Sequence, residues 1–130
     1  AICLKENNLP IDYVNIDLDD SHDLGYGLKK EYWHQGIVSE AVEAVIQQAK
    51  KDNLCYLTAT HDIKNIHSGN VMKKVGMHYC YSYKEQWMPK NRPVIFRMYQ
   101  INLDGKNGFI KNIGINMNIL LKKTYKGQVI

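Results

Sequence analysis

A change of hydrophobic period near the middle of the chain constrains the fold more than any other feature of the sequence. From residue 38 onward the apolar side chains recur at intervals of three and four, as on the buried face of an amphipathic α-helix. This face consists of Val38, Ala41, Val42, Val45, Ile46 and Ala49. The helix is expected to end near residues 52–53, and the flanking residues 24–28 and 54–60 have strand-like composition. The sequence therefore predicts a strand–helix–strand unit, with a right-handed crossover if both strands belong to one sheet.

Further strands and a second helix are predicted on both sides of this unit. The strands are expected at residues 1–5, 11–16, 77–87 and 93–103, with a turn at residues 89–91 between the last two. The second helix is short and is expected to begin at a Ser68 cap and to end at Gly76. The resulting order, β β β α β α β β, is typical of an α/β (α+β) domain, which we place at residues 1–103.

Residues 104–130 form a C-terminal extension with a strand-like pattern of its own. In this segment Ile113, Ile115, Met117 and Ile119 alternate with glycine and asparagine, which predicts one more half-buried strand. We expect residues 112–121 to add to an exposed sheet edge, either in the same chain or in a second copy, which gives a homodimer. The alternative is a disordered or helical tail, because asparagine weakens strands.

Composition and charge exclude several classes of protein. The chain has 130 residues and is 45% hydrophobic and 23% charged, which suits one globular domain. A net charge of +4 with dispersed lysines does not indicate a nucleic-acid-binding protein. No apolar run approaches the roughly 20 residues that span a membrane, and the first residues do not have the pattern of a signal peptide.

The cysteines and histidines predict neither a disulfide framework nor a metal site. Cys3, Cys55 and Cys80 lie far apart and without a CxxC pair, so they are interpreted as small buried thiols in a reducing compartment, most simply the cytoplasm. The five histidines are not spaced as metal ligands, and no metal is expected.

The segment "YWHQGIVSEA", residues 32–41, is the most informative short stretch of the sequence. It leads into the predicted helix through Gly36 and contains no strong capping residue before the helix. Free backbone N–H groups at a helix N-terminus attract anions, and a glycine allows a ligand to come close. The segment therefore predicts either an anion-binding site or an ordinary strand-to-helix turn.

Two longer segments resemble the GNAT N-acetyltransferases. These are "DLGYGLKKEYWHQGIVSEAVEAVIQQA" and "NIHSGNVMKKVGM", and the similarity is greatest to the subgroup of ribosomal-protein N-terminal acetyltransferases. The resemblance covers about residues 1–103 and implies a GNAT fold, a mixed and mostly antiparallel sheet whose central parallel strands splay around the cofactor. Trp33 fits the subgroup, whereas His34 and Val38 stand where smaller residues are usual. The family's first strand and helix pair are missing from this sequence.

The resemblance also implies acetyl-CoA as a co-substrate. Its pyrophosphate would bind the backbone amides of Gln35, Gly36, Ile37, Val38 and Ser39. Its pantetheine would lie along Gly25, Gly27 and Leu28 and contact Asn65 and Ser68. Backbone donors near Leu28 would polarise the thioester. Lys29, Lys30, Lys73 and Lys74 are further, weaker candidates for contacts with the phosphates.

Proton transfers of the implied reaction are assigned to Asp23 and Ser68. Asp23 occupies the position of a family glutamate and is the candidate base, beside an acidic loop at residues 17–20 that could attract a cationic substrate. Ser68 is the candidate acid for the leaving thiolate, because Met72 stands where many relatives have an acidic tyrosine; Tyr79 is a weaker alternative. The alternatives without a catalytic role are a solvent-exposed loop for the aspartates and a helix cap for Ser68.

The sequence thus supports two functions of different classes. The first is an N-acetyltransferase that transfers an acetyl group to a primary amine, carried by a small molecule or a peptide, by direct attack in a ternary complex. The second is a GNAT-like acyl-CoA-binding or regulatory module without turnover. The sequence does not distinguish a protein N-terminus, a polyamine and an aminoglycoside as the acceptor.

Overall fold

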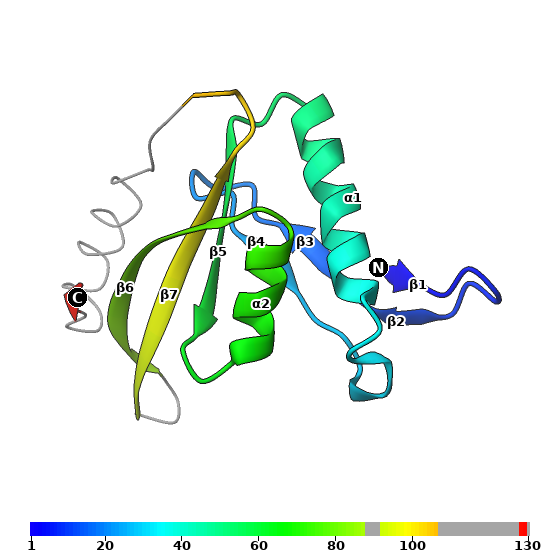
Figure 1. The fold of residues 1–130 in the computed structure, drawn as a ribbon, viewed down its shortest axis with the longest axis horizontal. Helices are drawn as coiled ribbons and strands as arrows, with labels where there is room; N and C mark the ends of the chain where they lie inside the picture. Colours follow the sequence, from blue (N-terminus) through cyan, green and yellow to red (C-terminus); the bar gives the residue numbers. More distant parts are fainter. Residues whose placement is uncertain (88–91, 107–127, 130) are drawn as a thin grey trace.

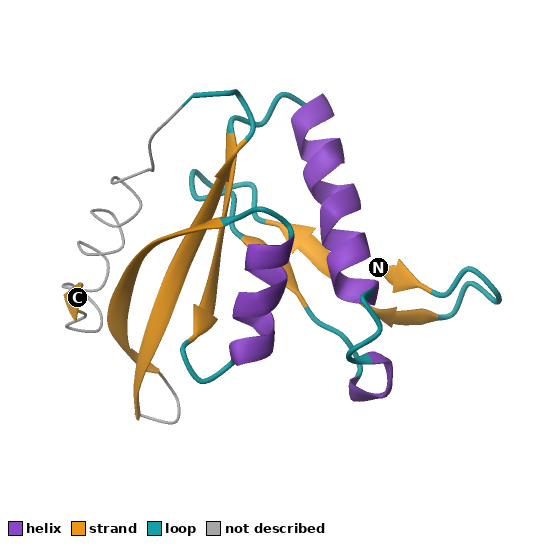
Figure 2. Ribbon diagram, in the orientation of Figure 1, coloured by secondary structure: helices purple, strands orange, loops and turns teal. Residues whose placement is uncertain are grey.

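Two helices pack on one face of a twisted sheet (Figures 1 and 2). The computed structural model describes residues 1–87, 92–106 and 128–129. Four strands form the main sheet in the order β5-β7-β6-β8, with every neighbouring pair antiparallel. They span Tyr56–Asp62 (β5), Arg92–Asn102 (β7), His78–Trp87 (β6) and Gln128–Val129 (β8). The architecture confirms the predicted fold class.

The first four strands form two short antiparallel pairs that precede the helices. β1 (Ile2–Cys3) pairs with β2 (Pro10–Asp12), and β3 (Val14–Ile16) pairs with β4 (Leu24–Tyr26). The prediction of one continuous strand at residues 11–16 is therefore wrong. The segment is divided near Tyr13, where the chain changes its pairing partner from β1 to β4.

The first helix, α1 (Ile37–Lys51), follows the predicted period closely. Its buried residues are Ser39, Val42, Ile46 and Ala49, and Val38 and Val45 are partly buried against the same core. A short 3-10 helix, η1 (Lys30–Tyr32), precedes it. The core lies between α1, α2 (Ile66–Lys74) and the facing side chains Leu57 and Ala59 of β5 and Tyr99 of β7.

The start of α2 corrects one sequence prediction. The N-cap is Asn65, whose side-chain oxygen accepts a hydrogen bond from the Ser68 N–H at 3.3 Å. Ser68 therefore lies inside the first turn and is not the cap. The predicted glycine at the other end is present, since Gly76 follows the helix with a φ of +91°.

The cysteines also differ from expectation. Cys3 and Cys55 are exposed and Cys80 is partly buried, although all three were predicted to be buried thiols. Cys3 lies at the end of the two-residue strand β1, and Cys55 lies just before β5, so neither side chain is enclosed by a neighbouring layer.

The C-terminal residues that the structure describes extend the sheet within the same chain. Val129 pairs with Tyr83 and Gln128 pairs with Lys84, which adds β8 to β6. The strand predicted at residues 112–121 and the turn predicted at residues 89–91 lie outside the described residues. Among the helices that are described, none combines the length and apolar character needed to cross a membrane.

The contact between α2 and β5 leaves no room for a side chain at Gly69. A Cβ atom built there would lie 2.7 Å from Nε2 and 2.8 Å from Cε1 of His61. The His61 side chain is 6% exposed and its ring centroid lies 5.5 Å from that of Tyr99, so it has little freedom to move away. Gly69 thus sets how closely α2 approaches the sheet.

Gly69→Ala is expected to lower the free energy of unfolding by about 1–3 kcal/mol, the usual effect of overpacking. A loss of stability would be informative, because alanine inside a helix is otherwise more favourable than glycine by about 1 kcal/mol. Urea denaturation measures the change, with Lys73→Ala on the exposed side of α2 as the control. A Gly69→Ala protein as stable as the parent would show that α2 is not held at this distance.

Candidate cofactor and active-site cleft

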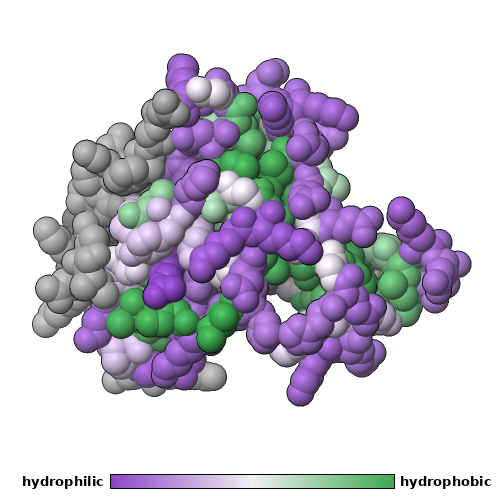
Figure 3. Space-filling model, viewed as in Figure 1, coloured by the Kyte–Doolittle hydropathy of each residue, from purple (hydrophilic) through white to green (hydrophobic). Residues whose placement is uncertain are grey.

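A cleft opens where β4 and β5 part. Among the described residues, their backbone pairing is limited to an isolated parallel bridge between Asp23, just before β4, and Thr58 of β5, and beyond it the two strands no longer pair. The cleft has a volume of about 890 Å³ and is lined from the end of β4, the loop before α1, the first turn of α1, the end of β5 and α2. Figure 3 shows this side of the molecule as largely hydrophilic, with hydrophobic residues visible between the two helices, at the lower left and near β1 and β2 at the right.

The loop between β4 and α1 is held by contacts of its aromatic residues. Trp33 Nε1 donates a hydrogen bond to the Leu28 carbonyl oxygen at 2.8 Å. His34 has a φ of +61°, a left-handed conformation that glycine adopts more easily. Its ring lies edge-on to that of His67 on α2, with 4.8 Å between the ring centroids. This contact joins the two walls of the cleft.

The N-terminus of α1 has the properties expected of an anion site. Gly36 is the N-cap, with a φ of +73°, and no side chain caps the helix. The first hydrogen bond of the helix runs from the Glu40 N–H to the Gly36 carbonyl oxygen at 3.0 Å. The N–H groups of residues 37–39 therefore have no acceptor within the helix. Lys74 Nζ lies 4.0 Å from the position of a Cβ on Gly36, which adds a positive charge at the same place.

The end of β4 directs a backbone donor into the gap. Gly27 N–H donates to the Tyr13 carbonyl at 3.1 Å and Lys29 N–H donates to the Ile11 carbonyl at 3.4 Å. Because successive backbone N–H groups of a strand point in opposite directions, the Leu28 N–H points the other way, toward the side of β5. This amide could donate to a carbonyl oxygen placed in the cleft.

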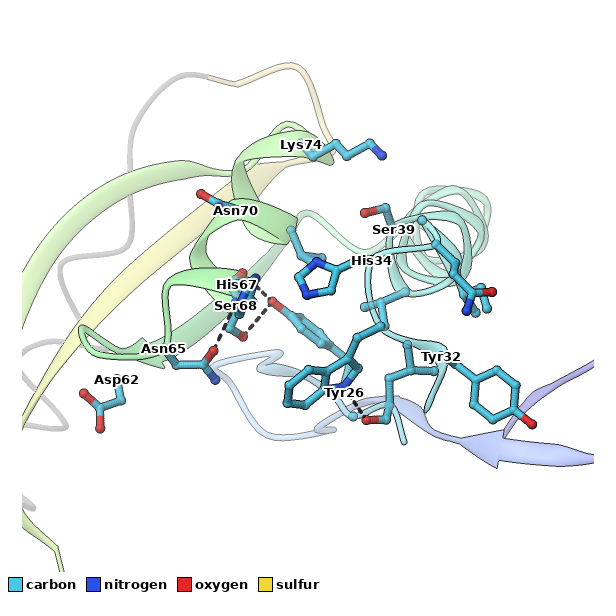
Figure 4. A pocket seen from close by; sticks show the side chains of 18 of the residues that line it. Tyr26, Tyr32, His34, Ser39, Asp62, Asn65, His67, Ser68, Asn70 and Lys74 are labelled. Atoms are coloured by element: carbon cyan, nitrogen blue, oxygen red, sulfur yellow. Dashed lines mark hydrogen bonds between the residues drawn. The ribbon is translucent and has the colours of Figure 1, made fainter. Parts of the chain in front are cut away.

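Two hydroxyl groups meet between β4 and α2 (Figure 4). Tyr26 Oη donates to the Ser68 carbonyl oxygen at 2.8 Å, and Ser68 Oγ donates to Tyr26 Oη at 3.0 Å. Both residues line the cleft. Burial raises the pKa of the Tyr26 phenol, and the hydrogen bond with Ser68 acts in the opposite direction.

Asp23 directly precedes β4, and its side chain lies on the opposite face of this extended segment from that of Tyr26, because side chains alternate along a strand. Burial raises the pKa of its carboxyl group to about 6, and the negative charges of Asp17 and Asp19 add to the shift, while the Thr58 hydroxyl lowers it. A carboxyl group with this pKa is ionised at neutral pH. It can therefore act as a general base that accepts a proton from the reacting amine.

The sequence of the first part of the chain decides the family. Residues 1–78, more than half of the chain, match the sequence model of the acetyltransferase (GNAT) domain. The chain belongs to the GNAT acetyltransferase family. A search of curated proteins gave no match.

Solved structures of acetyltransferases share the GNAT fold of this chain. A GNAT-family acetyltransferase from Bacillus anthracis is 24% identical over 78% of this chain and 64% of its own, with a TM-score of 0.70. The ribosomal-protein-S5-alanine acetyltransferase of Vibrio fischeri is 24% identical over 80% of this chain and 60% of its own, with a TM-score of 0.67. The protein yncA of Salmonella typhimurium, whose structure holds acetyl-CoA, is 13% identical over 78% and 63%, with a TM-score of 0.68. The chain thus spans less than two thirds of the length of each of these structures.

Of the ten residues predicted to bind the GNAT cofactor, Gly25 does not line this cleft and the other nine do. They are Gly27, Leu28, Gln35, Gly36, Ile37, Val38, Ser39, Asn65 and Ser68. Among the four lysines considered, Lys74 lines the cleft, whereas Lys29, Lys30 and Lys73 do not. Asp23 does not line it either, since its side chain is directed to the other face of the sheet.

Several cleft residues were not predicted from the sequence. Tyr26 stands between two glycines in the GNAT strand motif, and its hydroxyl could have been singled out as the only acidic group of that motif on the face of Leu24 and Leu28. His67 and Lys64 flank Asn65 in sequence, so their positions beside the cofactor site followed from that of Asn65.

The structure also accounts for the unusual residues of this GNAT chain. Met72 is 1% exposed and lies in the hydrophobic core, so its position on α2 serves packing. The Val38 side chain packs partly against the same core. Coenzyme A fits this cleft by the chemistry of its donors: free amides and a lysine for the pyrophosphate and a strand-edge amide for the thioester.

Proposed function

We propose that the chain is an acetyl-CoA-dependent N-acetyltransferase that acts on a primary amine. The observation that carries this proposal is the cleft between β4 and β5, which combines an uncapped helix N-terminus at one end with a directed strand amide and a hydroxyl pair at the other. Coenzyme A would bind with its pyrophosphate on the amides of residues 35–39 and its pantetheine along Gly27, Leu28 and Asn65.

Catalysis in this arrangement depends mainly on holding the reactants in line. Orienting an amine next to the thioester in a ternary complex can lower the activation barrier by about 7–11 kcal/mol. The Leu28 amide would stabilise the negative charge that develops on the thioester oxygen. Asp23 is the proposed base for the amine, and Ser68 belongs to the unit that protonates the leaving thiolate.

The acidic loop and Asp23 support a cationic acceptor. Asp17 and Asp19 are close enough to raise the pKa of Asp23, and the backbone of the same loop is fixed to β5 through Thr58, whose Oγ1 donates to the Ser21 carbonyl at 2.8 Å. We propose the ribosomal-protein N-terminal acetyltransferases as the subgroup and a peptide N-terminus as the first acceptor to test, with the cytoplasm as the location. A homodimer through residues 112–121 stays a prediction.

A second candidate is a module that binds acyl-CoA without turnover. It is favoured by Met72, which cannot donate a proton, and by the left-handed conformation of His34 at the pyrophosphate turn. Binding of coenzyme A is expected for both candidates, so only turnover distinguishes them.

An amine panel with the full chain tests the proposed function. Acetyl-CoA is mixed with an alanine-terminated peptide, a polyamine and an aminoglycoside in turn, and free thiol and acetylated amine are both measured. The proposal predicts that at least one amine yields thiol and acetylated product in equal amounts, above a control without protein. Saturable binding of acetyl-CoA with no amine-dependent release of thiol would contradict it in favour of the binding module.

A further inference from the structure

The hydroxyl groups of Tyr26 and Ser68 form a mutual pair at the wall of the cleft, and their hydrogen bonds differ in direction. Ser68 Oγ donates to Tyr26 Oη at 3.0 Å, and Tyr26 Oη donates to the Ser68 carbonyl at 2.8 Å (Figure 4). We propose that Tyr26 is the general acid that protonates the leaving thiolate, and that Ser68 is a positioning residue that stabilises the resulting phenolate. This inference rests on the proposed function and assigns a residue to one of its proton transfers.

The direction of the hydrogen bonds favours this assignment. The Ser68 proton already points at the phenol oxygen, where it would stabilise a negative charge that forms there. The Tyr26 proton rests on a backbone carbonyl, a neutral acceptor that a thiolate could replace by rotation of the hydroxyl. With the roles exchanged, the Ser68 hydroxyl would have to turn away from the phenol oxygen to which it donates, and it would leave an alkoxide, a far stronger base than a phenolate.

The acidity of the two groups leads to the same conclusion. A tyrosine has a pKa of about 10, near that of a thiol at about 8.5, whereas a serine hydroxyl does not ionise in this range. Burial raises the pKa of Tyr26 and the Ser68 hydrogen bond lowers it. The phenol is therefore protonated at neutral pH, as a general acid must be before the reaction.

The position of Tyr26 relative to Asp23 also fits the two proton transfers. Asp23 directly precedes β4 and stands three residues before Tyr26, so in this extended segment their side chains lie on opposite faces. An amine that approaches from the face of Asp23 would expel the thiolate toward the face of Tyr26 and α2. Base and acid are thus separated by the strand edge at which the thioester would sit.

The proton balance of the step is complete without a further reactant. The neutral amine attacks the thioester carbonyl, the N–C bond forms and the C–S bond breaks, and the electron pair of the C–S bond leaves with sulfur. Sulfur takes the Tyr26 proton, which produces the free thiol and a phenolate. The attacking nitrogen now carries two protons; it loses one of them to the phenolate through water, and the product amide keeps the other. The proton removed earlier from the ammonium group passes through Asp23 to solvent.

Other titratable groups around the cleft must be separated from Tyr26 in any pH experiment. The loop before α1 contributes Tyr32 and His34, and the segment from the end of β5 through α2 contributes Asp62, Lys64, His67 and Lys74. On the other face of β4 the groups are Asp17, Asp19 and Asp23. A limb of the pH profile of kcat can therefore be assigned to Tyr26 only if it moves when the acidity of the Tyr26 hydroxyl itself is changed.

Three single variants of the full chain test the assignment. Tyr26→Phe is expected to lower kcat about 10²- to 10⁴-fold, the range for loss of a general acid, while binding of coenzyme A changes less than about threefold. Ser68→Ala is expected to lower kcat only about tenfold, because the acid remains. Tyr81→Phe is the matched control, since Tyr81 is a partly buried tyrosine of β6 that lies outside the cleft, and kcat of this variant is expected to stay within about twofold of the parent.

A fluorinated tyrosine at position 26 provides a test that does not depend on the stability of Tyr26→Phe. Its hydroxyl keeps the size and bonds of the parent but is more acidic, so the decline of kcat at alkaline pH should move to lower pH. An alkaline decline that does not move, or a kcat of Ser68→Ala below that of Tyr26→Phe, would overturn the assignment in an active parent. A parent that releases no thiol with any amine would instead overturn the proposed function, and the role of Tyr26 with it.

Discussion

Asp23→Asn is expected to lower kcat/KM for the amine about 10²- to 10⁴-fold at neutral pH, the range for loss of a general base. The parent should lose activity as the pH falls through about 6, because the carboxylate becomes protonated there. The variant should lack that limb, so its loss of activity relative to the parent is largest above pH 6 and becomes about tenfold smaller with each pH unit below it. A pH–rate profile that keeps the limb in Asp23→Asn would remove Asp23 from the mechanism.

The same substitution is expected to stabilise the folded protein at pH 8. The pKa of Asp23 rises from 3.8 to about 6 on folding, so the ionised form is disfavoured in the folded state. At about 1.36 kcal/mol per pKa unit, the ionised carboxylate lowers the free energy of unfolding by about 2–3 kcal/mol. This penalty is fully present well above pH 6, is mostly lost as the pH falls from 6 to 4, and vanishes below 3.8, where the folded and unfolded groups are both protonated.

Urea denaturation at pH 8 and at pH 4 measures this gain in stability. Asp20→Asn is the matched control, since Asp20 is an exposed member of the same loop and does not contribute to the pKa shift of Asp23. Asp20→Asn should change the free energy of unfolding by no more than about 0.5 kcal/mol at either pH. Equal stability of Asp23→Asn and the parent at pH 8 would show that the carboxyl group is not desolvated in the fold.

Gly36→Pro is expected to weaken the binding of coenzyme A about 10- to 100-fold or more. Gly36 has a φ of +73°, whereas proline requires about −65°, so the turn that presents the amides of residues 37–39 must change. The proline also removes the Gly36 N–H. Loss of one hydrogen bond to a charged phosphate corresponds to about 1.5–3 kcal/mol.

The control for Gly36→Pro is Gly105→Pro. Gly105 has a similar φ of +74° but lies in a turn after β7, outside the cleft. Calorimetry should show unchanged affinity for coenzyme A in this control. If both proline variants lost binding equally, the effect would come from general unfolding, and the turn would have no specific role.

The features of the fold that depend on local periodicity could be predicted from the sequence. The apolar spacing of α1 and the glycine before it gave the helix within one residue of its observed start, because one face of a surface helix must be apolar. The same reasoning failed at residues 11–16, where a continuous strand-like pattern is shared between two pairing partners. Pattern shows that a segment is extended but not which strand it joins.

The contacts between distant residues could not be predicted in this way. Tyr26 and Ser68 are 42 residues apart, and their pairing depends on how α2 docks beside β4. The cap of α2 was assigned to Ser68 and is Asn65, since both residue types are good caps and stand three positions apart. Docking distance at Gly69 and the desolvation of Asp23 are likewise tertiary properties.

Hydrogen–deuterium exchange of the full chain with and without coenzyme A tests the central claim most directly. The proposed site predicts that bound coenzyme A slows exchange at the amides of residues 35–39, at Leu28 and at the start of α2, while the turn at Gly105 is unaffected. Protection confined to other segments, or no protection at concentrations of coenzyme A that saturate binding, would contradict the placement of the cofactor between β4 and β5.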